Sequence, residues 1–219
     1  MDLQRHLDYE LDELRDRVLL LGGEAEQALD HAMRALMQRD NDLAREVLGH
    51  DDEIDRLEVA IDRQCIDIIV LRQPAARDLR FVITVGKMAP VLERIADHAC
   101  NIARAAIDLN NEPELKPNID LAETGEHASS MLHAALDAFS TNDAAAARVV
   151  INCDAEINDL YNRIFHHLID LMVSDPATAT RDARLLFVAK HLERIGDYVT
   201  DLCELIVYMT EAAFIKHVH

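Results

Sequence analysis

The sequence predicts an all-α protein with six long helices arranged as two tandem, pseudo-symmetric three-helix bundles. Apolar residues recur every three or four positions almost throughout the 219 residues, which is typical of amphipathic helices. Glycine (6) and proline (5) are scarce and aromatic residues make up 4% of the chain, so the turns and strands of a β-sandwich or barrel are lacking. Half of the residues are hydrophobic, which is sufficient for one large core or two small ones.

The first half contains three of these helices. An apolar stripe over 7–36 predicts the first helix, and Asp40 or Asn41 is a suitable N-cap for the second. The second stripe covers 43–71 and stops at a proline, and the third covers 79–109.

The second half follows after a linker and repeats this order. Residues 110–118 (NNEPELKPN) carry two prolines and three asparagines and are the best linker candidate in the chain. Helices are then expected over 121–139 and 144–173, followed by a break at 174–176 and a last apolar stripe over 185–209.

The two halves also share residues at matching positions. At an offset of 103, eight residues of the second helix match the fifth: Asp40, Ala44, Arg45, Val47, Asp51, Glu53, Ile54 and Leu57 against Asp143, Ala147, Arg148, Val150, Asp154, Glu156, Ile157 and Leu160. At an offset of 100, Leu92-Glu93-Arg94-Ile95-x-Asp97 matches Leu192-Glu193-Arg194-Ile195-x-Asp197. We therefore expect two duplicated units, 1–112 and 118–215, placed end to end, each too small to be very stable alone.

The net charge and the distribution of apolar residues limit the classes of partner and the cellular compartment that we expect for this chain. Lys and Arg number 22 against 41 Asp and Glu, a formal net charge of −19. Nucleic acid and anionic lipid surfaces require a basic face, so cations or basic patches on another protein fit better. The amino terminus is charged rather than apolar, and no apolar run approaches the roughly 18 residues of a membrane span. We expect a cytoplasmic protein.

The cysteines do not form a metal or redox motif. Cys65, Cys100, Cys153 and Cys203 are scattered in apolar stretches without a CxxC pair, which favours small buried thiols.

Paired carboxylates carry the strongest chemical signal. Glu93 and Asp97 are four residues apart and therefore lie on one helix face, as do Glu193 and Asp197. Each pair adjoins a core position at the edge of the buried stripe. Only a small residue, an alanine in the first half and Gly196 in the second, separates core from carboxylate, which leaves room for an ion or a close backbone.

The preceding helix repeats the spacing in the first half. Residues equidistant from the turn of an antiparallel hairpin lie level with each other, because both helices have the same rise. Asp51 and Asp97 are equidistant from Pro74, and so are Asp55 and Glu93. Four carboxylates should therefore meet.

The second half offers three carboxylates at the same level. Asp154 pairs with Asp197 and Asn158 with Glu193 about the break before Pro176, so an amide replaces the fourth acid.

Such a cluster predicts a cation site. Four converging carboxylates cannot all stay ionised without a cation or proton uptake. All-oxygen ligands suit hard ions such as Mg²⁺, Mn²⁺, Ca²⁺ or Fe³⁺, and several bridging carboxylates permit more than one ion. The alternative interpretation is a solvated acidic face, with some acids bonded to Arg94 or Arg194.

Neighbouring polar residues are weaker candidates. Glu58 and Asp62 are expected to miss the cluster, because Glu58 would face Pro90. Asn101 and Asp201 lie one turn further along and are candidates for outer ligands. His98 is expected at the surface, since it points about 100° away from the neighbouring acid.

The chain resembles the PhoU family, the phosphate-transport accessory and regulatory proteins of bacteria, over nearly its whole length. The motifs that carry the resemblance are Leu21-Gly22-Gly23, Glu58-Val59-Ala60-Ile61-Asp62, Arg72-Gln73-Pro74-x-Ala76-x-Asp78-Leu79-Arg80 and the two Glu-Arg-Ile-x-Asp sequences.

The resemblance implies multinuclear metal clusters of iron, manganese, magnesium or zinc, held by pairs of E(D)xxxD motifs. Carried over position by position, the ligands are Asp51 with Asp55, Glu93 with Asp97, Asp154 with Asn158, and Glu193 with Asp197. Asn158 departs from the acidic pattern and weakens the case for a second cluster. Asp78 in the turn motif is a weaker candidate.

The resemblance also implies a regulator rather than an enzyme. Members of the family restrain the phosphate-starvation response and damp phosphate uptake through contacts with the sensor kinase PhoR and the transporter ATPase PstB. Dimers are common among them, and their partners bring them to the inner membrane. We add the hypothesis that the acidic faces and their metals contact basic or phosphate-bearing surfaces on partners.

Two other functions are weighed against this one. A carboxylate-bridged di-iron enzyme would require Glu-x-x-His motifs, and no histidine here has an acid three residues before it. A passive helical scaffold would carry its acids for solvation alone.

Overall fold

The computed structural model describes residues 2–113, 120–213 and 215, with side chains from residue 6 onward. Within these residues the chain forms six α-helices and one short 3₁₀ turn, and no strand. The elements are α1 (Asp2–Gln38), α2 (Asn41–Arg72), α3 (Ala76–Asn110), α4 (Leu121–Thr141), α5 (Ala144–Ser174), η1 (Pro176–Thr178) and α6 (Ala179–Glu211). The predicted all-α class is confirmed. Of the expected linker, residues 114–118 lie outside the described residues.

Side-chain caps fix where the second helix of each half begins. The Asp40 carboxylate accepts hydrogen bonds from the backbone N–H groups of Asp42 and Leu43, at 2.9 and 3.0 Å. Asp143 accepts from two backbone N–H groups at the start of α5 in the same way, at 2.9 Å each. The cap therefore repeats with the sequence. Helix α2 ends at Arg72, and its C-cap residue Gln73 has a left-handed φ of 49° and precedes a proline.

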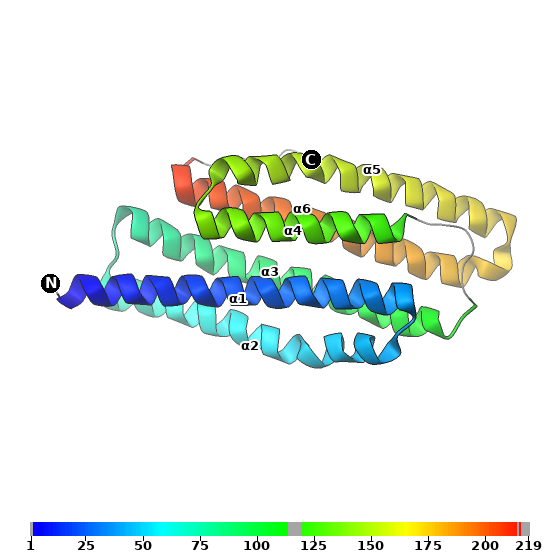
Figure 1. The fold of residues 1–219 in the computed structure, drawn as a ribbon, viewed down its shortest axis with the longest axis horizontal. Helices are drawn as coiled ribbons and strands as arrows, with labels where there is room; N and C mark the ends of the chain where they lie inside the picture. Colours follow the sequence, from blue (N-terminus) through cyan, green and yellow to red (C-terminus); the bar gives the residue numbers. More distant parts are fainter. Residues whose placement is uncertain (1, 114–119, 214, 216–219) are drawn as a thin grey trace.

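The two three-helix bundles lie side by side, not end to end as expected. Helices α1, α2 and α3 pack together, as do α4, α5 and α6, and the two groups meet where α3 runs along α6 and α1 along α4 (Figure 1). An internal repeat shows that a unit occurs twice but not how the copies pack. The exact bounds 1–112 and 118–215 remain a prediction.

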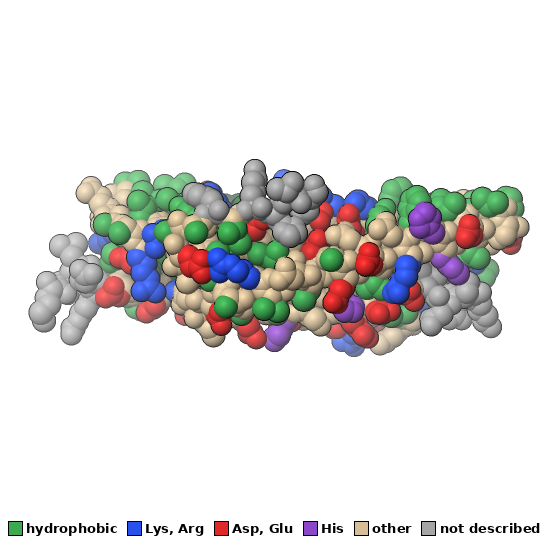
Figure 2. Space-filling model, turned by 90° about the horizontal axis from the view of Figure 1, so that it is seen from above, with side chains coloured by type: hydrophobic (Ala, Val, Ile, Leu, Met, Phe, Trp, Pro, Cys, Tyr) green, Lys and Arg blue, Asp and Glu red, His purple; other side chains and the backbone are tan. Residues whose placement is uncertain are grey.

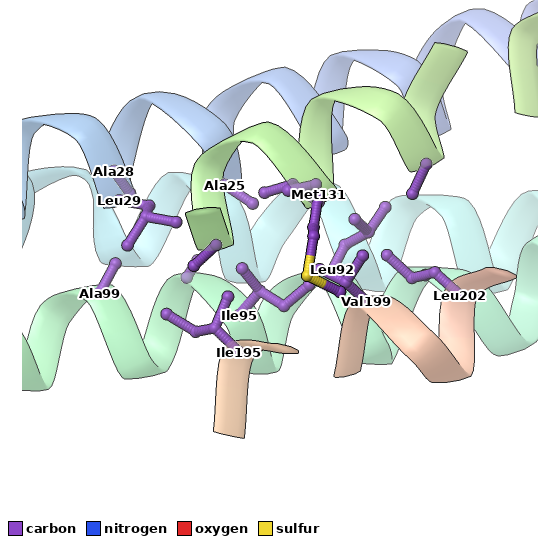
Figure 3. Packing of buried hydrophobic residues seen from close by; sticks show 14 of the residues in the cluster. Ala25, Ala28, Leu29, Leu92, Ile95, Ala99, Met131, Ile195, Val199 and Leu202 are labelled. Carbon is purple, nitrogen blue, oxygen red and sulfur yellow. The ribbon is translucent and has the colours of Figure 1, made fainter. Parts of the chain in front are cut away.

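One continuous hydrophobic core joins both halves. Its members come from all six helices. Leu92 of α3, Met131 of α4 and Val199 of α6 lie near one another in its centre (Figure 3). Cys65, Cys100 and Cys203 are buried in it and Cys153 is half-buried, all as free thiols, which confirms the interpretation of the cysteines.

Helices α3 and α6 are antiparallel, and polar contacts mark their register. The Arg80 guanidinium donates to the Met209 carbonyl at 3.0 Å near the end of α6. In their middle, the Nδ1 atoms of His98 and His191 are 2.8 Å apart. His98 is thus half-buried between the two halves rather than at the surface. Burial, and secondly the neighbouring His191, lower the pKa of His98 to about 4, so this ring is neutral at pH 7.

Glycines allow α1 and α4 to approach each other. A Cβ added at Gly22 of α1 would overlap the Leu136 side chain of α4, and a Cβ at Gly125 of α4 would lie 2.6 Å from the Met33 Cε of α1. Each helix thus places a glycine opposite a large side chain of the other helix. Close approach buries more apolar surface on both helices.

The surface carries both charge and exposed apolar groups. Figure 2 shows Asp and Glu side chains at several places along one face, with Lys and Arg between them. Some large apolar side chains are also exposed, including Val70, Leu71, Val173 and Phe187. In the described part of the chain, none of the helices has the length and apolar character that membrane crossing requires.

The glycine contact gives a test of how the halves pack. We expect Gly22→Val to lower the free energy of unfolding by about 1–3 kcal/mol, because the added methyl groups collide with Leu136. The matched control is Gly23→Val in the same helix, where a Cβ meets nothing within 4 Å. Urea unfolding followed by circular dichroism measures both. Equal stability of the two variants would contradict this close packing.

Candidate metal centre

The four acids of the first half lie on the facing edges of α2 and α3. Asp51 and Asp55 flank the buried Ile54 on α2, and Glu93 follows the buried Leu92 on α3. The Cys100 thiol donates to Asp51 Oδ1 at 3.3 Å. Because Cys100 is three residues beyond Asp97, this contact places Asp51 within one helical turn of the level expected from the distances to Pro74.

These acids interact electrostatically with one another. Burial, then the charges of Asp97 and Asp55, raise the pKa of Glu93 to about 7. Partial desolvation, then the charges of Asp51 and Asp97, raise the pKa of Asp55. Like charges at short range favour the protonated form of a carboxyl group. A cation would relieve the same repulsion.

Glu58 acts weakly on this group. Its charge is among the causes that raise the pKa of Glu93. Its own pKa is raised by burial and then by Asp62 and Asp55. The predicted register compares Cα levels only, whereas a glutamate side chain reaches about one turn along a helix. The charge of Glu58 therefore affects Glu93 less than the charges of Asp97 and Asp55 do.

The surroundings of the first cluster are partly solvated. Asp55 and Asp97 are exposed, and Asp51 and Glu93 are half-buried. Arg104 approaches the Asp51 carboxylate at 3.7 Å from a largely exposed position. Pairs of this kind contribute little to stability, which leaves the acids available to another cation.

In the second half, the residues that match the first cluster have different neighbours and a different burial. Asp154 is only 3% exposed, and the Asn158 amide donates to its carboxylate at 2.7 Å. A Cβ at Gly196 of α6 would lie 3.2 Å from Asp154 Oδ1, so the missing side chain lets this acid pack between α5 and α6. The small residue beside the motif in the sequence was the signal for this close approach.

The two motif acids of α6, Glu193 and Asp197, form ion pairs with basic residues of the same helix. The Lys190 ammonium lies 2.5 Å from Glu193, and Arg194 lies 2.9 Å from Asp197. Arg194 also stacks on Tyr198, with its guanidinium carbon 5.1 Å from the ring centre. At the offset of 100, Pro90 stands where α6 has Lys190, so the first half lacks this ammonium group.

The weaker candidates are spread out. Asn101 accepts a hydrogen bond from Arg104 at 2.9 Å, and Asp201 is exposed one turn beyond the second motif. Asp78 lies about four turns before Glu93 on α3, where it lines a separate cavity of about 350 Å³ with Arg15 and Arg77. The structure does not bring Asp78 to the carboxylates.

The side chains do not form a closed coordination shell as they stand. Among the described residues, no three His, Cys, Asp or Glu side chains converge tightly enough to hold an ion. The first half instead presents neighbouring acids that act on one another, of which Asp51 lies 3.7 Å from Arg104. In the second half, Glu193 and Asp197 are paired with Lys190 and Arg194.

Comparison with known proteins gives a single family. A family model described as "PhoU domain" matches residues 18–106 and again 121–206. The chain is 34% identical to the phosphate-specific transport system accessory protein PhoU homolog of Pseudomonas aeruginosa, over 99% of this chain and 90% of that protein. It is 35% identical to the protein PhoU of Escherichia coli, over 100% and 92%.

Solved structures agree with these relatives. The crystal structure of PhoU from Pseudomonas aeruginosa matches with a TM-score of 0.91 and 35% identity, covering 94% of this chain and 99% of the other. The phosphate transport system regulatory protein PhoU from Streptococcus pneumoniae matches with a TM-score of 0.89 and 29% identity, covering 96% and 100%.

The raised pKa of Glu93 predicts how the metal-free protein responds to pH. Because the folded pKa of about 7 exceeds the ordinary 4.5, the folded state binds more protons between these values. Stability should therefore fall as the pH rises from 4.5 to 7 and stay lowered above. We expect Glu93→Gln to stabilise the metal-free protein by about 1–2 kcal/mol at pH 8, discounted for partial exposure, and far less at pH 4.5.

Urea unfolding in the presence of a chelator measures this effect. Asp159→Asn, which removes an exposed charge from α5, is the matched control, and its stability relative to the wild type should not change with pH. A Glu93→Gln variant with wild-type stability at pH 8 would show that the four acids do not strain one another.

Asn158 offers a second test, in the other half. We expect Asn158→Asp to destabilise the metal-free protein by about 2–3 kcal/mol, because Asp154 loses a donor and gains a like charge. The same variant should bind Mn²⁺ more tightly than the wild type, since it completes four carboxylates. Calorimetric titration with Mn²⁺ and urea unfolding measure the two effects. Unchanged values in both would count against a metal site there.

Proposed function

This chain belongs to the PhoU family of phosphate-transport accessory proteins, and from that premise we propose that it restrains the phosphate-starvation response and damps phosphate uptake. The observation that carries the proposal is the match of both repeats and nearly the whole length to proteins named for the phosphate-specific transport system. The relatives are named as accessory or regulatory proteins rather than as enzymes. A non-catalytic adaptor is the corresponding role for this chain.

The adaptor would act at the cytoplasmic side of the inner membrane, to which its partners bring it. The partners are the sensor kinase PhoR and the transporter ATPase PstB, as family resemblance implies. A formal charge of −19 supports protein partners with basic surfaces. Each adaptor would work as a homodimer.

Metal ions would form part of the contact surface. Asp51, Asp55, Glu93 and Asp97 would hold hard ions such as Mg²⁺, Mn²⁺ or Fe³⁺ in the first half, because their donors are all oxygen and their repulsion favours a cation. Ions bound there would offer positive charge to phosphate-bearing groups on a partner.

Occupation of the second half would be weaker. Asp154, Glu193 and Asp197 already interact with Asn158, Lys190 and Arg194, in that order. A cation must displace the two basic side chains before it gains the carboxylates. We therefore assign the higher affinity to the first half.

The regulatory role is tested in a bacterium that lacks its own PhoU protein and carries a reporter of the phosphate-starvation response. Expression of this chain should restore repression of the reporter in phosphate-rich medium. Glu93→Ala/Asp97→Ala should lose most of that repression, whereas Asp159→Asn, of comparable exposure on α5, should keep it. Failure of the wild-type chain to repress, at a level of protein confirmed by immunoblot, would contradict the regulatory role.

The metal-dependent contact has its own test. Purified Glu93→Ala/Asp97→Ala should capture less of the ATPase and of the kinase in a pull-down than the wild type does. Full capture by the variant would separate partner binding from the carboxylate cluster and reject that part of the proposal.

A further inference from the structure

A groove between α1 and α2 gathers histidines and acids away from the carboxylate cluster. It encloses about 210 Å³, and Val47 and Ile54 belong to its lining as buried apolar residues. Its polar lining includes two imidazoles and three carboxylates, contributed by His31, His50, Glu24, Glu46 and Glu53.

One of the imidazoles is oriented by the backbone. The Nδ1 atom of His50 lies 2.9 Å from the carbonyl oxygen of Glu46. A carbonyl oxygen can only accept, so Nδ1 carries the proton and donates it. In the neutral ring Nε2 then keeps its lone pair. Metal-binding histidines are held in this way, with one ring nitrogen bonded to a backbone carbonyl and the other on the metal.

The acids around His50 come from both helices. Glu46 and Glu53 are four residues before and three residues after His50, and they share its face of α2. Glu24 of α1 lines the same groove from the opposite helix. His31 lies two turns beyond Glu24 on the same face of α1.

We propose that this groove binds one divalent transition-metal ion of the Zn²⁺ class through His31, His50 and glutamates of its rim. Imidazole nitrogen combined with carboxylate oxygen suits Zn²⁺, Cu²⁺ or Ni²⁺, whereas all-oxygen sets suit harder ions. The three groove acids neutralise the ion. As they stand, no three of these groove side chains converge on one point. Glu46 and Glu53 are exposed, so binding requires that their side chains and the two imidazoles rotate toward the ion.

The groove is distinct from the acids on α2 and α3. His50 and Asp51 are adjacent in sequence but point about 100° apart around α2. His50 lines the groove toward α1, whereas Asp51 contacts Cys100 of α3. The proposal does not rest on the regulatory role.

Titration of the full-length, metal-free chain with Zn²⁺ tests the site, in a Glu93→Gln/Asp97→Asn background that removes two of the four acids of the first cluster. One Zn²⁺ should bind, and His31→Ala and His50→Ala should each weaken binding at least about tenfold. The double variant should lose it. His167→Ala, an exposed histidine of α5, is the matched control and should bind like its parent.

A spectroscopic probe identifies the ligands. Electron spin echo of bound Cu²⁺ should show imidazole nitrogen in the parent and none in His31→Ala/His50→Ala. Nitrogen coupling that persists in the double variant, or Zn²⁺ affinity equal to that of His167→Ala, would overturn the proposal. Circular dichroism confirms that each variant is folded.

Discussion

Each third helix is buried on two sides, and the rest of the structure depends on this constraint. Helix α3 packs within its own bundle and also along α6, and α6 does the same in reverse. Small residues of α3 make this possible. Four of its alanines are at most 1% exposed and let the neighbouring helices approach: Ala89, Ala96, Ala99 and Ala103. Only a narrow edge of each third helix is left for polar side chains. The acidic motifs occupy that edge, facing the second helix of their own bundle.

The duplicated units keep their core and differ at this edge. Core positions are constrained by contacts on every side, so a change there costs several kcal/mol, whereas an edge residue can change at little cost. In the first half, burial and the neighbouring acids raise the pKa of Asp55 and of Glu93. The second carries an amide, an ammonium group and a guanidinium beside its three acids. One scaffold thus presents two electrostatic environments, of which the first is better prepared for a cation.

The two edges of α2 also carry different kinds of metal-ligand atom. The edge toward α3 offers oxygen ligands only, and the edge toward α1 offers imidazoles together with carboxylates. Because ions differ in their preference for nitrogen and oxygen, the two edges of one helix can select different metals. Their difference in direction follows from the 3.6-residue period alone, since adjacent residues point about 100° apart.

The sequence by itself determined the six helices, the capping residue Asp40 of α2 and the level of the acids within each hairpin. These features are local: apolar period, capping aspartates and a common rise per residue act over a few turns. The contacts of Asp51 with Cys100 and of Asp154 with Gly196 lie near the expected levels for that reason.

Only the tertiary structure decided how the bundles meet. An apolar stripe shows that a face is buried but not which helix covers it, so the side-by-side packing and the burial of His98 against His191 could not be predicted. The balance of charge in the second half likewise depends on rotamers of Lys190 and Arg194 that no periodicity encodes.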